Sequence, residues 1–399
     1  MSSTRTLEHE SVTIFRKYLR IPSVQPNVNY SECIRFLEEQ SQRLGLPLNI
    51  YYITPEKPIV IITWVGQQPE LPSLLLTSHM DVVPVYPECW TYNPFSAYKD
   101  ENGNIFARGA QDMKCVGIQY LETIRKYITE QLKFNRTIHI CFTPDEEIGS
   151  QFGMAKFVKT SEFSALNVGF ALDEGKATPN EVFNVFYCER TVWDLVITCV
   201  GPTGHGSLLH ENTAGEKIQY IINKFMNWRE VEKNRLRNSN LGPGDVTTVN
   251  LTKIKGGCQI NVVPNELSVG FDIRLAINVD IKQIERTVLE WCDNAGPGVT
   301  VQFKENPICV KPTKVDNSNP WWVAFKTECD KMNMKLNTCV ATGGTDARFI
   351  RNEGIPALGF SPMNNTITLA HDHNEFINEK TFIKGLDIYY NIIKGLAQI

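Results

Sequence analysis

The sequence predicts an α/β protein in which a mostly parallel sheet, flanked by helices, is interrupted by an inserted α+β domain. Strand-like apolar runs alternate with helical segments up to residue 189, a pattern typical of parallel sheets. Between residues 190 and 305 the order changes to β-α-β-β-α-β, which is typical of a ferredoxin-like unit. The alternation then resumes. We therefore expect residues 1–189 and 306–399 to form one domain around the insertion.

Apolar periodicity places the individual elements along the chain. Apolar positions near helical spacing predict two amphipathic helices near 8–20 and 30–44. The run from Ser73 to His79 is apolar until its last residues, which predicts a strand buried on both faces. The other elements expected in the first domain are strands near 48–53, 59–64, 137–143, 168–173 and 356–360 and helices near 112–131, 319–333 and from 378 onward. Those expected in the insertion are strands near 194–200, 246–254, 266–275 and 299–303 and helices near 213–236 and 280–294.

Composition and charge exclude several classes of protein. The 399 residues are 42% hydrophobic and 21% charged, enough apolar material for a sizeable core. The net charge of −4 and the lack of basic blocks argue against nucleic acid as a partner. No apolar run approaches the ~20 residues that span a bilayer, and the first ten residues lack the apolar core of a signal peptide. With 11 cysteines but no C-x-x-C pair, we expect reduced thiols in a cytoplasmic protein without membrane contact.

An acidic triplet, Asp145-Glu146-Glu147, directly follows one predicted strand. Adjacent carboxylates repel one another, so a shared pocket would require a cation. The alternative is a solvated acidic loop, because runs of charge usually lie on exposed surfaces.

Other metal-capable side chains occupy similar places. They are His79, Asp112, Glu174 and His371, which with Glu147 make two histidines and three carboxylates at strand ends and loops. Each residue taken alone is more often structural. Together they form a nitrogen and oxygen ligand set suited to zinc, manganese or cobalt rather than calcium. Five ligands suit two metals if one carboxylate bridges them, and two metals can activate a water and polarise a carbonyl.

Four short motifs carry a resemblance to a known family. They read His-Met-Asp-Val-Val-Pro from His79, Gly-Ala-Gln-Asp-Met-Lys from Gly109, Pro-Asp-Glu-Glu-Ile-Gly from Pro144, and Asp-Glu-Gly from Asp173. In this order they resemble the dizinc amidohydrolase/peptidase family that includes carboxypeptidase G2-like and succinyl-diaminopimelate desuccinylase-like enzymes. The stretches 107–116, 250–253, 316–322 and 356–364 resemble the branch of type 1 aminoacylases, the N-acyl-L-amino-acid amidohydrolases.

The resemblance implies a zinc-peptidase-like fold whose inserted domain serves as a dimerisation and lid domain. It also implies two Zn²⁺ per subunit. Asp112 would bridge both ions, with His79 and Glu174 completing one site and Glu147 and His371 the other.

Two further residues receive catalytic roles by the same resemblance. Asp81 would accept the second N–H of His79 and fix its tautomer. Glu146, which is beside a ligand without being one, would be the general base. His371 is preferred to His373 as the ligand because its four-residue offset to Glu375 fits the family pattern.

The remaining candidates bind substrate or stabilise charge. His205 resembles the family histidine that reaches the active site of a neighbouring subunit and stabilises the oxyanion, and its alternative is a turn histidine. Asn261 resembles a residue that holds substrate. Arg348 and Arg274 could grip the substrate carboxylate through their planar guanidinium groups, although Arg274 could instead be a salt-bridged strand residue.

These observations predict a homodimeric hydrolase of small N-acyl-L-amino acids that releases a carboxylate and a free amino acid. A dipeptidase or N-succinyl amidohydrolase is the alternative within the family, because the metal residues are common to all of these enzymes. A catalytically silent metal-binding protein is disfavoured, because Glu146 and every expected ligand are present.

Overall fold

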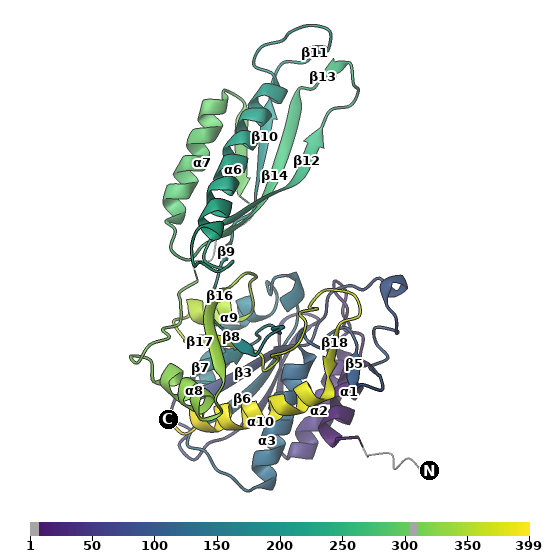
Figure 1. Ribbon diagram of the computed structural model, residues 1–399, viewed down its shortest axis with the longest axis vertical. Coiled ribbons are helices and arrows are strands. Elements are labelled where there is room, and N and C mark those ends of the chain that lie inside the picture. The colour runs from purple at the N-terminus through teal and green to yellow at the C-terminus, as the bar shows by residue number, and fades with distance from the viewer. Residues whose placement is uncertain (1–7, 304–309) are drawn as a thin grey trace. The chain divides into compact units, whose positions relative to one another are not determined.

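The computed structural model describes residues 8–303 and 310–399, and within it the chain forms two compact units (Figure 1). Unit 1 comprises Met1–Tyr187, Lys311–Cys339 and Thr345–Ile399, and unit 2 comprises Cys188–Val310 and Val340–Gly344. The domain boundary expected at 305/306 lies outside the described residues.

Unit 1 is built on an eight-stranded mixed sheet with the order β1-β2-β6-β3-β7-β17-β8-β16. The strands are β1 (Leu48–Thr54), β2 (Lys57–Trp64), β3 (Ser73–His79), β6 (Ile138–Thr143), β7 (Val168–Asp173), β8 (Val182–Glu189), β16 (Lys335–Ala341) and β17 (Ala357–Phe360). The inner strands β6, β3, β7 and β17 run parallel to one another, whereas β2 pairs antiparallel with β1 and β6, and β8 pairs antiparallel with β17. Every residue of β3 and β6 is buried, as expected for strands covered on both faces.

Helices cover this sheet. The helix α10 (Glu379–Leu396) packs against α1 (Glu10–Leu19), α3 (Lys114–Thr129) and α8 (Pro320–Lys331), and α3 in turn contacts α2 (Ser31–Leu44), β3 and β6 (Figure 1). Aromatic side chains join the layers, such as Phe15 stacked on Phe382 with ring centroids 4.5 Å apart. The short helix α9 (Ala347–Asn352) instead packs on β7 and β17. The helices α4 (Met154–Phe157) and α5 (Ser161–Ala165) fill the connection between β6 and β7.

A small three-stranded sheet, β18-β5-β4, lies outside the main one. Its strands are β4 (Tyr98–Lys99), β5 (Asn104–Phe106) and β18 (Phe376–Asn378), with Phe376 paired to Phe106. This pairing brings the segment after β5, which contains Asp112, next to the segment before β18, which contains His371.

Unit 2 has the predicted β-α-β-β-α-β order, here β10-α6-β12-β14-α7-β15. Its antiparallel sheet is ordered β12-β14-β10-β15, with β9 (Thr191–Val192) paired to β14. The strands are β10 (Leu195–Val200), β12 (Thr248–Gly256), β14 (Glu266–Leu275) and β15 (Val299–Phe303). The helices α6 (Ala214–Arg237) and α7 (Ile281–Ala295) pack on this sheet (Figure 1). A capping box between Thr213 and Glu216 begins α6.

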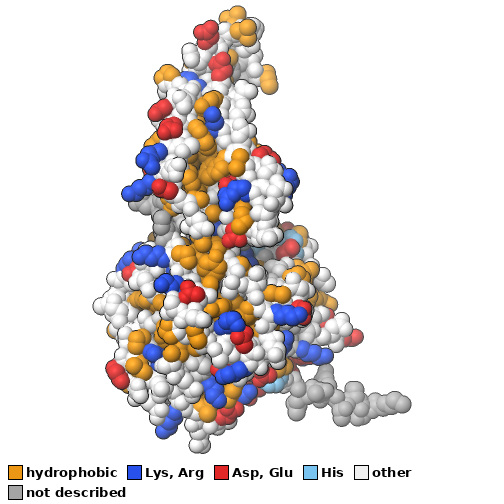
Figure 2. All heavy atoms as spheres, turned by 60° about the vertical axis from the view of Figure 1, so that its left-hand side comes forward, with side chains coloured by type: hydrophobic (Ala, Val, Ile, Leu, Met, Phe, Trp, Pro, Cys, Tyr) orange, Lys and Arg blue, Asp and Glu red, His pale blue; other side chains and the backbone are white. Residues whose placement is uncertain are grey.

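Charge is mixed on the visible surface. Lys and Arg side chains alternate with Asp and Glu over both units on the face drawn in Figure 2. No helix in the described ranges is long and apolar enough to cross a membrane.

Candidate active site

The acidic triplet is partly buried rather than solvated. After β6 ends at Thr143, Asp145 adopts a left-handed conformation with φ of 56° and begins a short 3₁₀ turn, Glu146–Ile148. Asp145 is buried, and its Oδ2 accepts the N–H of Phe152 at 2.8 Å. Burial raises the pKa of Asp145 to about 6. The triplet therefore lies in an ordered 3₁₀ turn, and its carboxylates face the interior of unit 1.

The first group of metal-capable side chains is His79, Asp112 and Glu174, which come from the end of β3, the loop before α3 and the end of β7. The Nε2 atom of His79 lies 3.0 Å from Oδ1 of Asp112 and 3.8 Å from Oε2 of Glu174. His79 is only 1% exposed, because it ends a fully buried strand. Parallel strands end at the same edge of a sheet, which explains why His79 and Glu174 meet.

The second group is Asp112, Glu147 and His371. The Nε2 atom of His371 lies 3.2 Å from Oδ2 of Asp112 and 2.9 Å from Oε2 of Glu147. One oxygen of Asp112 thus faces each histidine, which is the arrangement of a carboxylate shared between two sites. The other candidate, His373, packs against the ring of Tyr86 at 6.2 Å between centroids.

Negative charge is concentrated around these two groups. Burial raises the pKa values of Glu146, Glu147 and Glu174, and neighbouring carboxylates raise them further. Burial alone would also raise the pKa of Asp112, but hydrogen bonds from His371 and His79 hold it well below its ordinary value. The hydrogen bonds of His371 to Asp112 and Glu147 raise the pKa of its imidazole to about 10.

The residues present fit a pair of divalent cations. In each group the potential ligand atoms lie within 4.8 Å of one another. The buried Oε1 atom of Glu147 has no hydrogen-bond partner among the described residues. Imidazole and carboxylate ligands with no thiolate suit zinc, cobalt or manganese, and bound cations would offset the repulsion among the carboxylates.

Asp81 acts on this site differently from the expectation. The Nδ1 atom of His79 bonds to the main-chain oxygen of Asp81 at 2.8 Å, whereas the Asp81 carboxylate is 3.7 Å away. That carboxylate instead accepts the N–H groups of Glu146 at 3.3 Å and Glu147 at 3.2 Å, and an amide hydrogen of Gln25 at 2.6 Å. Asp81 therefore holds both His79 and the acidic turn in place.

Arg348 lies near the same turn, at the start of α9. Its NH2 group donates to the main-chain oxygen of Gly149 at 2.8 Å, two residues after the acidic triplet. Its guanidinium group also lies over the ring of Phe349, 4.7 Å from the centroid.

Three predicted residues, His205, Asn261 and Arg274, belong to unit 2. His205 is exposed on β11 (Gly204–His205), which pairs with β13 (Val262–Val263), and the oxygen of Asn261 accepts the N–H of Gly206. Arg274 makes two hydrogen bonds to Asp272, at 3.0 and 2.8 Å, and so forms the salt bridge that was its alternative assignment. The structure groups His205 with Asn261 and places Arg274 on β14.

Comparison with known proteins assigns the chain to a family. The family model described as peptidase family M20/M25/M40 matches residues 75–395. Aminoacylase-1 of Sus scrofa is 48% identical over 398 residues, which are 100% of this chain and 98% of that protein. The chain belongs to peptidase family M20/M25/M40. The resemblance inferred from the four motifs is therefore confirmed.

Solved structures of the M20 family share the fold. An M20 family metallo-carboxypeptidase from Sulfolobus solfataricus superposes with a TM-score of 0.77 at 18% identity, covering 98% of this chain and 100% of that one. A dinuclear metal-binding peptidase of the M20 family from Bacillus subtilis gives a TM-score of 0.67 at 15% identity, covering 97% of each chain. The predicted α/β class is confirmed, with antiparallel strands flanking the parallel centre.

Two buried carboxylates next to the site, those of Asp173 and Asp346, were not among the site residues predicted from the sequence. Asp173 accepts hydrogen bonds from Thr77 Oγ1 at 2.7 Å and from the N–H of Ala347 at 2.8 Å, and Asp346 accepts one from Thr143 Oγ1 at 2.6 Å. Burial and the charge of Asp173 raise the pKa of Asp346 to about 7. Asp346 precedes α9 in the Gly-Gly-Thr-Asp-Ala-Arg loop, and its contact with Thr143, which is 203 residues away along the chain, has no local signal in the sequence.

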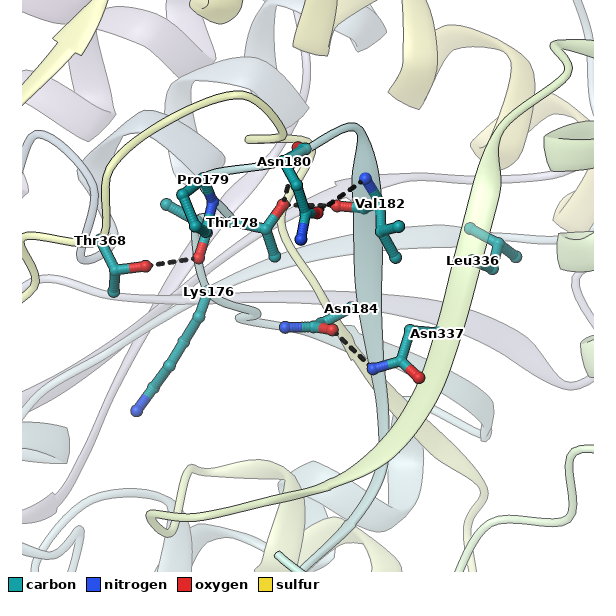
Figure 3. A pocket seen from close by; sticks show the side chains of 10 residues that line it. Lys176, Thr178, Pro179, Asn180, Val182, Asn184, Leu336, Asn337 and Thr368 are labelled. Atoms are coloured by element: carbon teal, nitrogen blue, oxygen red, sulfur yellow. Dashed lines mark hydrogen bonds between the residues drawn. The ribbon is translucent and has the colours of Figure 1, made fainter. Parts of the chain in front are cut away.

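A cavity of about 630 Å³ borders the loop that follows Glu174 (Figure 3). Its polar side chains bind one another or the main chain. Nδ2 of Asn337 donates to Oδ1 of Asn184 at 2.9 Å, and Thr368 Oγ1 donates to the oxygen of Ala177 at 2.8 Å. Neither metal-capable group lines this cavity.

Proposed function

We propose that the protein hydrolyses N-acyl-L-amino acids to a carboxylate and a free L-amino acid. One observation carries the proposal: two histidine–carboxylate groups share Asp112, and Glu146 stands next to them without belonging to either. The end-to-end identity with an aminoacylase-1 supports this substrate class among those of metal-dependent amidohydrolases.

The metal ions proposed are two Zn²⁺ per subunit. His79, Asp112 and Glu174 would hold one ion, and Asp112, Glu147 and His371 the other. Such a pair activates a water for attack and polarises the scissile carbonyl. Asp81 keeps His79 and the Glu146–Glu147 turn oriented through the hydrogen bonds described above.

Glu146 is proposed as the general base. Its carboxylate would take a proton from the attacking water and deliver it to the leaving nitrogen of the amide. Burial and the charge of Glu174 raise its pKa, which favours accepting that proton. The Asp81 carboxylate holds the N–H of Glu146 and so limits movement of the base.

Roles in substrate binding and charge stabilisation are proposed for four charged or polar side chains. A guanidinium has five donors, and the contact with Gly149 uses only one of those of Arg348. We propose that Arg348 binds the substrate carboxylate, with Asn261 holding the substrate and Arg274 a weaker candidate because of its pairing with Asp272. His205 would stabilise the oxyanion.

We also propose a cytoplasmic homodimer in which His205 acts across subunits. Two features support this assembly. His205 is exposed, with its Nδ1 held 2.7 Å from Ser207 Oγ, and β12 leaves an edge of the unit 2 sheet open for pairing.

The test combines metal analysis with a panel of substrates on the purified full-length protein. The panel contains N-acetyl-L-methionine, short dipeptides and N-succinyl amino acids. We expect two zinc ions per subunit and the highest kcat/KM for the acetylated amino acid. Preference for a dipeptide or a succinylated substrate would overturn the substrate class, and hydrolysis unaffected by chelators would overturn the metal mechanism.

A further inference from the structure

Three buried side chains, Arg108, Gln111 and Glu375, join the loop that carries Asp112 to the loop that carries His371. None of the three belongs to either metal-capable group. Their exposed fractions are 2%, 3% and 0%. We refer to them as the loop clasp.

Glu375 binds the Asp112 loop through both of its carboxylate oxygens. Oε2 accepts from Arg108 NH1 at 2.8 Å and from the N–H of Gly109 at 3.0 Å. Oε1 accepts from the N–H groups of Gln111 at 2.6 Å and Asp112 at 3.2 Å. Every one of these partners is a donor, so both oxygens of Glu375 act as acceptors.

The side chain of Gln111 binds the main chain of the loop that carries His371. Its Nε2 donates to the main-chain oxygens of Ile367 at 2.9 Å and Phe376 at 2.8 Å, and its Oε1 accepts the N–H of Leu369 at 2.9 Å. Arg108 NH1 adds a bond to the oxygen of Asp372 at 3.1 Å. The contacts therefore lie on both sides of His371 along the chain.

The two histidines of the site are held in different ways. His79 ends the buried strand β3, and its Nδ1 is bonded to the Asp81 oxygen. The His371 side chain is 55% exposed, and its φ of 66° is uncommon for a residue with a side chain. A residue keeps such a conformation only where many surrounding contacts stabilise it. Around His371 the loop clasp supplies these contacts.

We propose that the loop clasp sets the separation of Asp112 and His371 and thereby controls the affinity of the second metal position, formed by Asp112, Glu147 and His371. The inference rests on the proposed function, because it requires two bound cations. Arg108, Gln111 and Glu375 are positioning residues, since they act through the ligands. The first metal position depends mainly on residues at strand ends, so we expect its affinity to change less when the clasp is altered.

The test compares two clasp variants with two matched controls. Gln111→Met removes three side-chain hydrogen bonds but keeps the four bonds of Glu375. Glu375→Gln replaces one accepting oxygen with an NH2 group, which then faces other donors. The control Gln119→Met changes another buried glutamine, which donates to the Phe382 oxygen at 2.9 Å. The control Glu122→Gln changes another buried glutamate, which accepts from Ser11 and Arg125.

The measurement is the titration of metal-free full-length protein with Zn²⁺ or Co²⁺ against a competing chelator, with circular dichroism to verify folding. We expect two cations per subunit in the wild type and in both controls, even if a control lowers the Tm. In the clasp variants the first cation should remain tight, while the second binds ~10–100-fold more weakly, the usual effect of losing an outer partner of a ligand. Excess Zn²⁺ should restore the second cation.

Equal weakening of both cations, or unchanged affinities, in folded Gln111→Met protein would overturn the role of the clasp. If Glu375→Gln fails to fold, Gln111→Met decides the question, because it leaves the carboxylate and its four bonds intact. A wild type that binds fewer than two cations would overturn the proposed function itself, and with it the clasp.

Discussion

The proposed general base, Glu146, can be distinguished from the neighbouring candidate ligand, Glu147, by a pair of isosteric substitutions. Glu146→Gln removes a carboxylate that lies outside both metal-capable groups, whereas Glu147→Gln removes one whose Oε2 lies 2.9 Å from His371. The two residues are adjacent in the chain and share the Asp81 carboxylate through their N–H groups. Local distortion should therefore be similar in the two variants, and their difference reports the chemistry of each side chain.

The expected magnitudes follow from those positions. Loss of a general base typically costs at least ~100-fold in turnover, or about 2.7 kcal/mol of transition-state stabilisation. Glu146→Gln should keep two metal ions, because Glu146 belongs to neither metal-capable group. Glu147→Gln should lose the second ion first, since it deprives that position of an anionic ligand.

The assay is kcat for N-acetyl-L-methionine together with the metal content after dialysis. Glu146→Gln should combine two metal ions with turnover reduced at least ~100-fold. Near-normal turnover in that variant would refute the assignment of the base. Loss of metal from Glu146→Gln but not from Glu147→Gln would show that the two roles are exchanged.

Three further outcomes are expected. Arg348→Lys should lower kcat/KM by roughly 10-fold, mainly through KM, because an ammonium keeps the charge but not the bidentate geometry; an unchanged KM would contradict this. His205→Ala should be inactive alone and regain activity when mixed with Glu146→Gln, and failure of that rescue in a stable dimer would place the site within one subunit. Burial lowers the pKa of His139 from 6.5 to about 4, so the unfolded chain binds the extra proton between these values. Stability should therefore fall by up to about 3 kcal/mol as the pH drops from 6.5 to 4. The Tm of His139→Gln should fall less over that range, and parallel curves would refute the prediction.

Three of the five candidate metal ligands follow a signal that is local in the sequence. The strands β3, β6 and β7 are apolar runs that end at polar residues, and the residues at or just beyond those ends are His79, Glu147 and Glu174. The order of a β-α-β-β-α-β unit is also visible along the chain, and unit 2 follows it.

Other features depend on contacts that no local pattern encodes. The strands β8 and β16 were not predicted, because polar residues such as Asn184 and Asn337 interrupt their apolar pattern near the edge of the sheet. The main-chain oxygen of Asp81, rather than its carboxylate, faces the His79 ring, and no local sequence pattern distinguishes these two contacts. Glu375 was noted only for its spacing from His371, because its partners are mostly main-chain N–H groups, which leave no trace in the sequence.

The position of β17 within the sheet affects how the chain can fold during translation. This strand lies between β7 and β8 although it is made more than 160 residues after β8 begins at Val182. Until residues 357–360 leave the ribosome, β7 has an unpaired edge of the kind that promotes aggregation. His371 emerges later still, so the nascent chain can present His79, Asp112, Glu147 and Glu174 to metal before the second position is complete. A chain that lacked its last thirty or so residues would keep every strand of the main sheet but would lose both His371 and α10, the helix that packs on α1, α3 and α8.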